Sequence, residues 1–204
     1  MTKERLKSPR ARLFVALDLP EEIRSGLAGW QRDAFAGIEA LRPTKPEALH
    51  VTLCFLGYHP EREIERIAQL VCGIEARPVR MRLEPEPVAV PRNRPRLFAV
   101  DAPSEGAVAL QQELSDRLEA EHFYKPEKRP FWSHVTVARV RSEKGSRGGG
   151  RRGGPRAVER TPAPLPEELL EPFSAARVAL YRSFLRPTGA EYVRLAELTS
   201  DWPS

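Results

Sequence analysis

Two short β-rich runs with the same His-Val-Thr core constrain this fold most. The runs are "LHVTLCFLG" and "PFWSHVTVARV", and their histidines stand 84 residues apart. Each run is too short and too rich in β-branched residues for a helix, so each predicts a strand. Side chains two apart on a strand share a face, so His50 lies beside Thr52, and His134 beside Thr136. The repeat predicts a site assembled from two strands that are distant in sequence.

Strand-like and helix-like segments alternate along the rest of the chain. This mixed order, with connections short enough for hairpins, favours an α+β fold over a regular doubly wound sheet. Ser104 precedes one apolar periodicity and is a suitable helix cap. Helices are predicted over 20–35, over 60–74 and after Ser104, and further strands over 12–19, 79–85, 86–91, 96–102, 173–185 and 190–198, the last two joined by a turn at 186–189.

The positive charge is concentrated in one segment. The chain has a net charge of +5, and residues 142–164 contribute six Lys or Arg against two Glu, which is +4. The same segment holds six of the thirteen glycines and almost no large apolar side chain. It cannot bury enough surface to offset its ordering entropy, so we expect a flexible basic loop. The loop is either a solvated insertion or an arm that follows a nucleic-acid backbone by charge.

Length and composition predict one folded unit over 1–204 in the cytoplasm. The opening basic stretch is followed by a short alternating segment, far below the length of a signal or membrane-spanning sequence. Two cysteines, Cys54 and Cys72, have neither the number nor the spacing of a disulfide framework or a zinc site, and we interpret both as small core residues. We expect no membrane association and no obligatory protein partner, and therefore a monomer.

The paired His-x-Thr elements suit proton transfer at phosphorus. An imidazole titrates near neutrality, so two of them can deprotonate a nucleophile and protonate a departing oxygen at once. The threonine hydroxyls could hold the non-bridging oxygens. A lone strand histidine is more often packed or exposed than catalytic, which is our interpretation of His59 and His122. No third ligand supports a metal site, no Gly-x-Ser-x-Gly supports a serine hydrolase, and no glycine-rich loop supports nucleotide binding.

Four separate stretches, in order along the chain, carry a resemblance to a known family. "LFVALDLP", "LHVTLCFLG", "RPFWSHVTVAR" and "LYRSFLRPTGAEY" are similar to the RNA 2′,3′-cyclic phosphodiesterases, also called 2′-5′ RNA ligase-like proteins, of the two-histidine phosphoesterase superfamily. The resemblance runs through most of 12–198 and leaves the basic loop outside. Ser133 departs from it, since many relatives have proline before the second histidine.

The resemblance implies a bilobal α+β fold, in which two related halves with antiparallel sheets and flanking helices face a central cleft. It implies catalytic roles for His50 and His134 and phosphate contacts for Thr52, Thr136 and Arg139. Strict alternation would place Arg139 on the wrong face, so a bulge or its long side chain must bring it round. Family precedent makes one histidine the acid and the other the base, and we assign His50 as acid and His134 as base.

The implied reaction is the opening of a terminal 2′,3′-cyclic phosphate by water to a 2′-phosphomonoester. It needs no metal and no cofactor, and ligation of a 5′-hydroxyl without ATP is a related activity. Substrates of the same chemistry are 2′-5′-linked oligonucleotides and small cyclic nucleotides. A module that only binds RNA is the alternative from another class. Three aromatic residues could stack on a base, although each is more typical of a core: Phe14, Phe98 and Tyr181.

Overall fold

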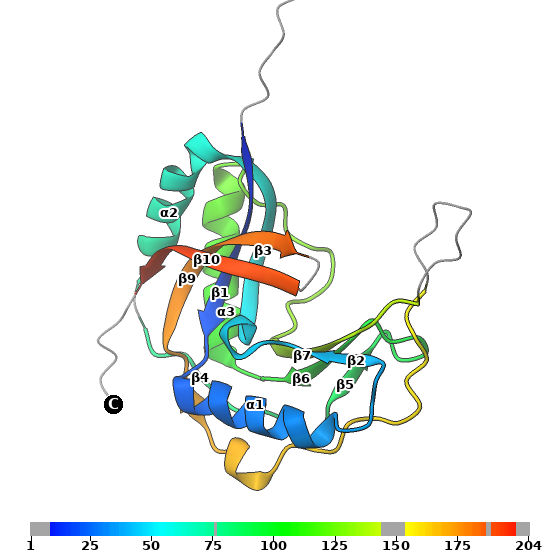
Figure 1. Cartoon of the computed structure of the whole chain (residues 1–204). Helices are drawn as coiled ribbons and strands as arrows, with labels where there is room; N and C mark the ends of the chain where they lie inside the picture. The colour runs from blue at the N-terminus through cyan, green and yellow to red at the C-terminus, as the bar shows by residue number, and fades with distance from the viewer. Residues whose placement is uncertain (1–8, 76, 144–153, 187–188, 199–204) are drawn as a thin grey trace, which may run out of the picture.

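The computed structural model describes residues 9–75, 77–143, 154–186 and 189–198. Strands and helices alternate as the sequence predicts, with three short 3₁₀ turns between them (Figure 1). The strands are β1 (Arg10–Asp18), β2 (Leu41–Pro43), β3 (His50–Pro60), β4 (Arg80–Met81), β5 (Val88–Val90), β6 (Leu97–Asp101), β7 (His134–Val140), β8 (Phe173–Ser174), β9 (Arg177–Arg186) and β10 (Gly189–Leu198). The helices are α1 (Glu21–Ala34), α2 (Ile64–Cys72) and α3 (Glu105–Ala120), and the 3₁₀ turns are Pro46–Ala48, Glu61–Glu63 and Glu167–Leu169.

One antiparallel sheet of eight strands carries the fold. Its order is β10-β9-β1-β3-β7-β6-β5, with β2 paired to β7 beside β3. The sheet has two halves, because β3 and β7 meet through a single residue pair, Val51 opposite Val135. Each half therefore contributes one His-x-Thr strand at the seam between them (Figure 1).

The helices cover the two halves differently. In Figure 1, α2 and α3 lie behind the half that contains β1, β3, β9 and β10, and α1 lies beneath the half that contains β2, β5, β6 and β7. The buried amide of Gln31 in α1 donates to the carbonyl of Val137 in β7 over 2.7 Å, which fixes that helix to the sheet. A continuous apolar core joins the sheet and helices, and it includes Leu27, Leu114 and Leu180.

The predicted α+β fold with antiparallel sheets is confirmed, and several boundaries differ. The short strand β2 was not predicted, because three residues are too few to show alternation. The strand expected over 79–85 shrinks to β4, and the helix expected over 60–74 begins with a 3₁₀ turn. The Ser104 cap is present, since its hydroxyl accepts from the amide of Ala107. The turn at 186–189 falls partly outside the described residues.

The central part of the basic segment, 144–153, also lies outside the described residues. The residues on either side of it are fixed by backbone hydrogen bonds and by packing. The amide of Glu143 donates to the carbonyl of Gly154, the amide of Arg156 donates to the carbonyl of Arg141, and Val158 packs against the core. The described part of 154–164 is thus anchored to the fold, because these backbone groups pair and one apolar side chain is partly buried.

Candidate active site

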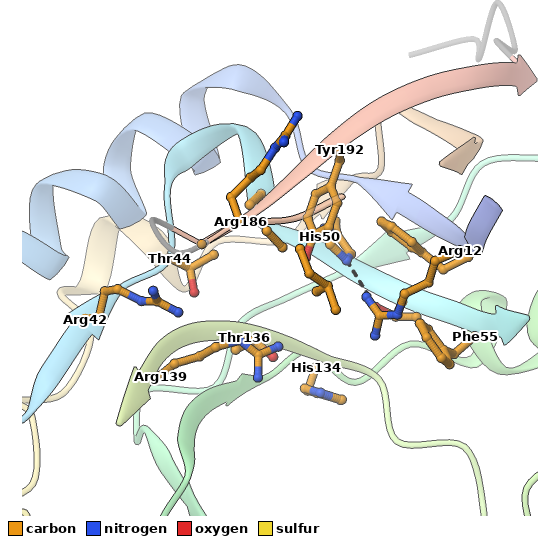
Figure 2. A pocket seen from close by; sticks show the side chains of 16 residues that line it. Arg12, Arg42, Thr44, His50, Phe55, His134, Thr136, Arg139, Arg186 and Tyr192 are labelled. Atoms are coloured by element: carbon orange, nitrogen blue, oxygen red, sulfur yellow. Dashed lines mark hydrogen bonds between the residues drawn. The ribbon is translucent and has the colours of Figure 1, made fainter. Parts of the chain in front are cut away.

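A cavity of about 390 Å³ lies over the seam where β3 meets β7. The two histidines are the first residues of these strands, and each lies two positions from its threonine on the face that borders the cavity. Figure 2 shows side chains from both halves of the sheet converging there. The cavity brings together all five residues that the sequence singled out: His50, Thr52, His134, Thr136 and Arg139.

A β-bulge follows each threonine and resolves the problem of Arg139. In β7, Thr136 pairs with Ala99 and Ala138 with Phe98, which leaves Val137 unpaired. Both Val137 and Ala138 are buried, so the alternation shifts by one and Arg139 returns to the face of Thr136. The long side chain alone is not needed to explain the geometry.

The same bulge occurs in β3. Thr52 pairs with Ala16 and Cys54 with Val15, so Leu53 is the unpaired residue. Phe55 then takes the position in β3 that Arg139 takes in β7, and it lines the cavity. The cation on this side comes from another strand, because the guanidinium of Arg12 lies 4.4 Å from the centre of the Phe55 ring.

Hydrogen bonds orient both imidazoles. In His134, Nδ1 lies 2.7 Å from the carbonyl oxygen of Trp132, which can only accept, so this nitrogen carries hydrogen and Nε2 is left for proton transfer. The imidazole of His50 donates a hydrogen bond to the carbonyl of Ala48, which is again two residues upstream. Its Nε2 lies 3.1 Å from Oγ1 of Thr52.

The two imidazoles differ in their tendency to hold a proton. Burial lowers the pKa of His50 to about 4, and the positive charges of His134 and Arg139 act in the same direction, although the Ala48 carbonyl opposes them. Burial also lowers the pKa of His134, while the Trp132 carbonyl and the carboxylate of Asp101 raise it. His50 is the imidazole held most firmly in its neutral form.

Aromatic rings enclose both histidines. The Phe14 ring is stacked on His50 at 5.0 Å and on Tyr181 at 5.3 Å between ring centres. The indole of Trp132 is stacked on His134 at 3.9 Å. Phe14 lines the cavity although it is nearly buried, whereas Phe98 lies in the core away from it and Tyr181 binds a carboxylate instead.

An aspartate stands opposite each histidine on the neighbouring strand. Asp18 pairs with His50, and Asp101 pairs with His134. Asp18 is buried, which raises its pKa, and it accepts a hydrogen bond of 2.8 Å from the hydroxyl of Tyr181. Asp101 accepts from the indole of Trp132 over 2.7 Å. This pair was not predicted, although both aspartates end apolar strand runs of similar composition, "FVALD" and "FAVD".

The cavity also contains cationic residues that were not predicted from the sequence. Arg12, Arg42 and Arg186 line it with Arg139, and no carboxylate does so among the described residues. The available signal was weak, because arginine is common throughout this chain and nothing in the sequence assigns β2 to β7.

The remaining interpretations concern residues away from the cavity. His59 contacts Glu63 and the carbonyl of Leu56, and His122 occupies a left-handed turn with φ of 60°, so neither histidine lies in the site. Cys54 is buried as expected, whereas Cys72 is only partly buried. In the described ranges, no three His, Cys, Asp or Glu side chains come together as a metal site.

Comparison with known proteins identifies the family. The model of the LigT like Phosphoesterase family matches residues 17–94. An RNA 2′,3′-cyclic phosphodiesterase of Thermus thermophilus is 31% identical over 201 residues, which cover 92% of this chain and 89% of that protein. An RNA 2′,3′-cyclic phosphodiesterase of Escherichia coli is 32% identical over 132 residues, which cover 65% of this chain and 73% of that protein. This chain belongs to the RNA 2′,3′-cyclic phosphodiesterase family.

A solved structure agrees with this family membership. A crystal structure of a Thermus thermophilus protein superposes with a TM-score of 0.74 at 29% identity, and covers 92% of this chain and 97% of that one. The LigT like Phosphoesterase model ends before the second His-x-Thr strand, so the likeness in the second half of the site comes from these longer matches. Along the part of the chain that the structure covers, no helix has the length and apolar character needed to cross a membrane.

Proposed function

We propose that this protein hydrolyses RNA ends that carry a 2′,3′-cyclic phosphate and leaves a 2′-phosphomonoester. The observation that supports this most is that His50-x-Thr52 and His134-x-Thr136 come from separate halves of the sheet and line one cavity. An imidazole on each side of one phosphorus atom is the arrangement that an in-line displacement needs. The names of the relatives point to the same substrate.

The two imidazoles can carry out both proton transfers that the hydrolysis requires. Water attacks phosphorus and loses a proton to one imidazole, a P–O bond forms, and the bond from phosphorus to the 3′-oxygen breaks. The other imidazole protonates the 3′-oxygen, which leaves as a hydroxyl. The hydroxyls of Thr52 and Thr136 and the guanidinium of Arg139 donate to the non-bridging oxygens as charge gathers on them. If a 5′-hydroxyl takes the place of water, the same displacement forms a 2′-5′ linkage without ATP.

The electrostatics favour His50 as base and His134 as acid, the reverse of our assignment from the sequence. A base must be neutral before the reaction, and the pKa of His50, lowered by burial to about 4, ensures this at pH 7. The acid must hold a proton. Burial lowers the pKa of His134 as well, but the Trp132 carbonyl and the carboxylate of Asp101 oppose that effect, so His134 is the more easily protonated of the two imidazoles. The phosphate of the substrate, an anion beside both rings, raises both of these lowered pKa values on binding.

The hydrolysis is tested with an oligonucleotide that ends in a 2′,3′-cyclic phosphate, in the presence of excess chelator. We expect turnover without added metal and a loss of about 10²–10⁴-fold in kcat for His50→Ala and for His134→Ala, the range of general acid–base catalysis. His122→Ala is the matched control and should be unaffected, because His122 lies outside the cavity. Absence of turnover in the wild type, or full activity of either His50→Ala or His134→Ala, would refute the proposal.

The acid is identified with a cyclic substrate in which sulfur replaces the 3′-oxygen. A thiolate departs without protonation, so removal of the acid should matter much less for this substrate. We expect the thio substrate to restore most of the rate to His134→Ala and little to His50→Ala. The opposite pattern would assign the acid to His50 instead.

We further propose that the enzyme acts as a monomer in the cytoplasm. The two free cysteines suit a reducing compartment, since disulfides are rare there. One chain supplies both histidines and both threonines of the cavity, which supports a monomer as the active form. Light scattering coupled to size exclusion should give the mass of one chain, 23.0 kDa. A stable dimer of that chain would contradict the first part, and recovery in a membrane fraction of the cell would contradict the second.

A further inference from the structure

Two arginines face one another in the cavity without a carboxylate between them. Arg42 of β2 is paired directly with Arg139 of β7, so both side chains point to the same face of the sheet. Both line the cavity, and neither forms an ion pair with any residue that the structure describes. Like charges directly opposite one another destabilise a sheet. Phosphate anions bound beside these two side chains would relieve that repulsion.

Arg42 enters the cavity further along β7 than the histidines and threonines do. On one edge of β7, β3 pairs at Val135 and β2 pairs from Ala138 onward. Arg42, opposite Arg139, is thus three positions beyond Thr136, which is up to about 10 Å of extended chain. Figure 2 shows Arg42 and Thr44 to one side of His50 and His134, with Arg12 and Phe55 to the other.

Beyond Phe55 the electrostatic character reverses. A second cavity of about 400 Å³ shares Thr52, Phe55 and His134 with the first, so the two adjoin. Its lining includes three carboxylates against one arginine, whereas the first cavity has four arginines. A polyanion that leaves the histidines is therefore repelled on the Phe55 side and attracted on the Arg42 side. The carboxylates are Asp116, Glu119 and Glu127, and the arginine is Arg129.

We propose that Arg42 and Thr44 form a second phosphate subsite, which takes the internucleotide phosphate on the 5′ side of the terminal nucleotide. This inference rests on the proposed function and names its substrate class: an oligonucleotide end is preferred to a cyclic mononucleotide. The guanidinium of Arg42 can donate two hydrogen bonds to one phosphate, and the hydroxyl of Thr44 can donate another. The amide of Thr44 bonds the carbonyl of Val137, which fixes this segment beside β7.

Three substrates test the subsite: a 2′,3′-cyclic mononucleotide, a dinucleotide ending in a 2′,3′-cyclic phosphate, and the same dinucleotide with an uncharged methylphosphonate linkage. For the wild type we expect kcat/KM to be at least about tenfold higher on the natural dinucleotide than on the methylphosphonate, the worth of a charge-assisted hydrogen bond. Arg42→Gln should remove that advantage and leave the other two substrates unchanged. Arg92→Gln, the same change at an exposed position outside both cavities, should behave as wild type on all three.

Each other result overturns the subsite. Equal loss on all three substrates would mean that Arg42 acts at the reacting phosphate, and no loss on any would mean that it binds none. Equal wild-type rates on the two dinucleotides would remove the subsite while leaving the proposed function intact. Unchanged hydrolysis of the mononucleotide by Arg42→Gln also shows that this variant is folded. Absence of wild-type turnover on the mononucleotide and both dinucleotides would refute the proposed function itself.

Discussion

Replacing His50 by asparagine should change how the stability of the protein depends on pH. Burial lowers the pKa of His50 from 6.5 to about 4 in the folded protein, whereas the unfolded chain keeps the ordinary value. Between pH 6.5 and pH 4 the unfolded chain therefore binds a proton that the folded protein excludes. The contribution of this group to stability is complete above pH 6.5 and is lost as the pH falls.

The size of the effect follows from the two pKa values. The difference between 6.5 and about 4 corresponds to about 3 kcal/mol over the whole window, at about 1.4 kcal/mol per pH unit. Between pH 7 and pH 5 the same values give about 2 kcal/mol. This is an upper figure, because one edge of the ring borders the open cavity and its exposed area is that of a half-buried side chain.

Asparagine is the suitable replacement, because its amide can donate to the Ala48 carbonyl and does not titrate. Urea unfolding at pH 7, 6 and 5 should show the wild type losing up to about 2 kcal/mol more than His50→Asn over this range. His122→Asn is the control, since asparagine tolerates the left-handed backbone of that exposed position and the wild-type slope should persist. Asp18 does not affect the difference, because it is present in all three proteins. Parallel curves for the wild type and His50→Asn would refute the reasoning.

Three further predictions concern single residues. Gly57→Ala should lower the free energy of unfolding by about 1–2 kcal/mol, because φ is +80° at this position of β3 and nothing lies near the added methyl group, and activity should be unchanged; no loss in urea unfolding would contradict this. Ser104→Ala should cost about 1 kcal/mol by thermal or urea unfolding, since the hydroxyl caps α3, and Ser104→Gly should cost less. Phe14→Leu should lower the free energy of unfolding by about 1 kcal/mol, which leaves the protein folded, and should also lower kcat, because His50 loses the ring stacked on it. An unchanged kcat in steady-state assays would contradict this.

The sequence predicts the strands and helices better than the site. Hydrophobic periodicity marks long elements such as α3 and β9, whose buried faces repeat several times. The same signal cannot detect β2, and without β2 nothing brings Arg42 to Arg139. The alternation of β7 even argued against Arg139, because a bulge depends on pairing with a partner strand and not on the strand's own pattern.

For the charged residues too, the sequence shows local composition but not which residues the fold brings together. Counting residues located most of the net charge in 142–164, but the arginines that line the cavity come from β1, β2, β7 and β9, where their number is ordinary. Only the strand order gathers them. The residue pair Asp18 and Asp101 was missed for the same reason, since each faces its histidine from a neighbouring strand.

The bulges at Leu53 and Val137 interrupt the regular pairing of the sheet in order to orient side chains of the cavity. Regular pairing of Val137 with β6, with no residue removed, would abolish the bulge, yet it would turn Arg139 away from the phosphate. A redesigned sequence chosen only for ideal strand geometry would therefore have straight strands and would lose the phosphate contact of Arg139. In each His-x-Thr strand, the extra residue after the threonine decides which side chain, Phe55 or Arg139, borders the cavity.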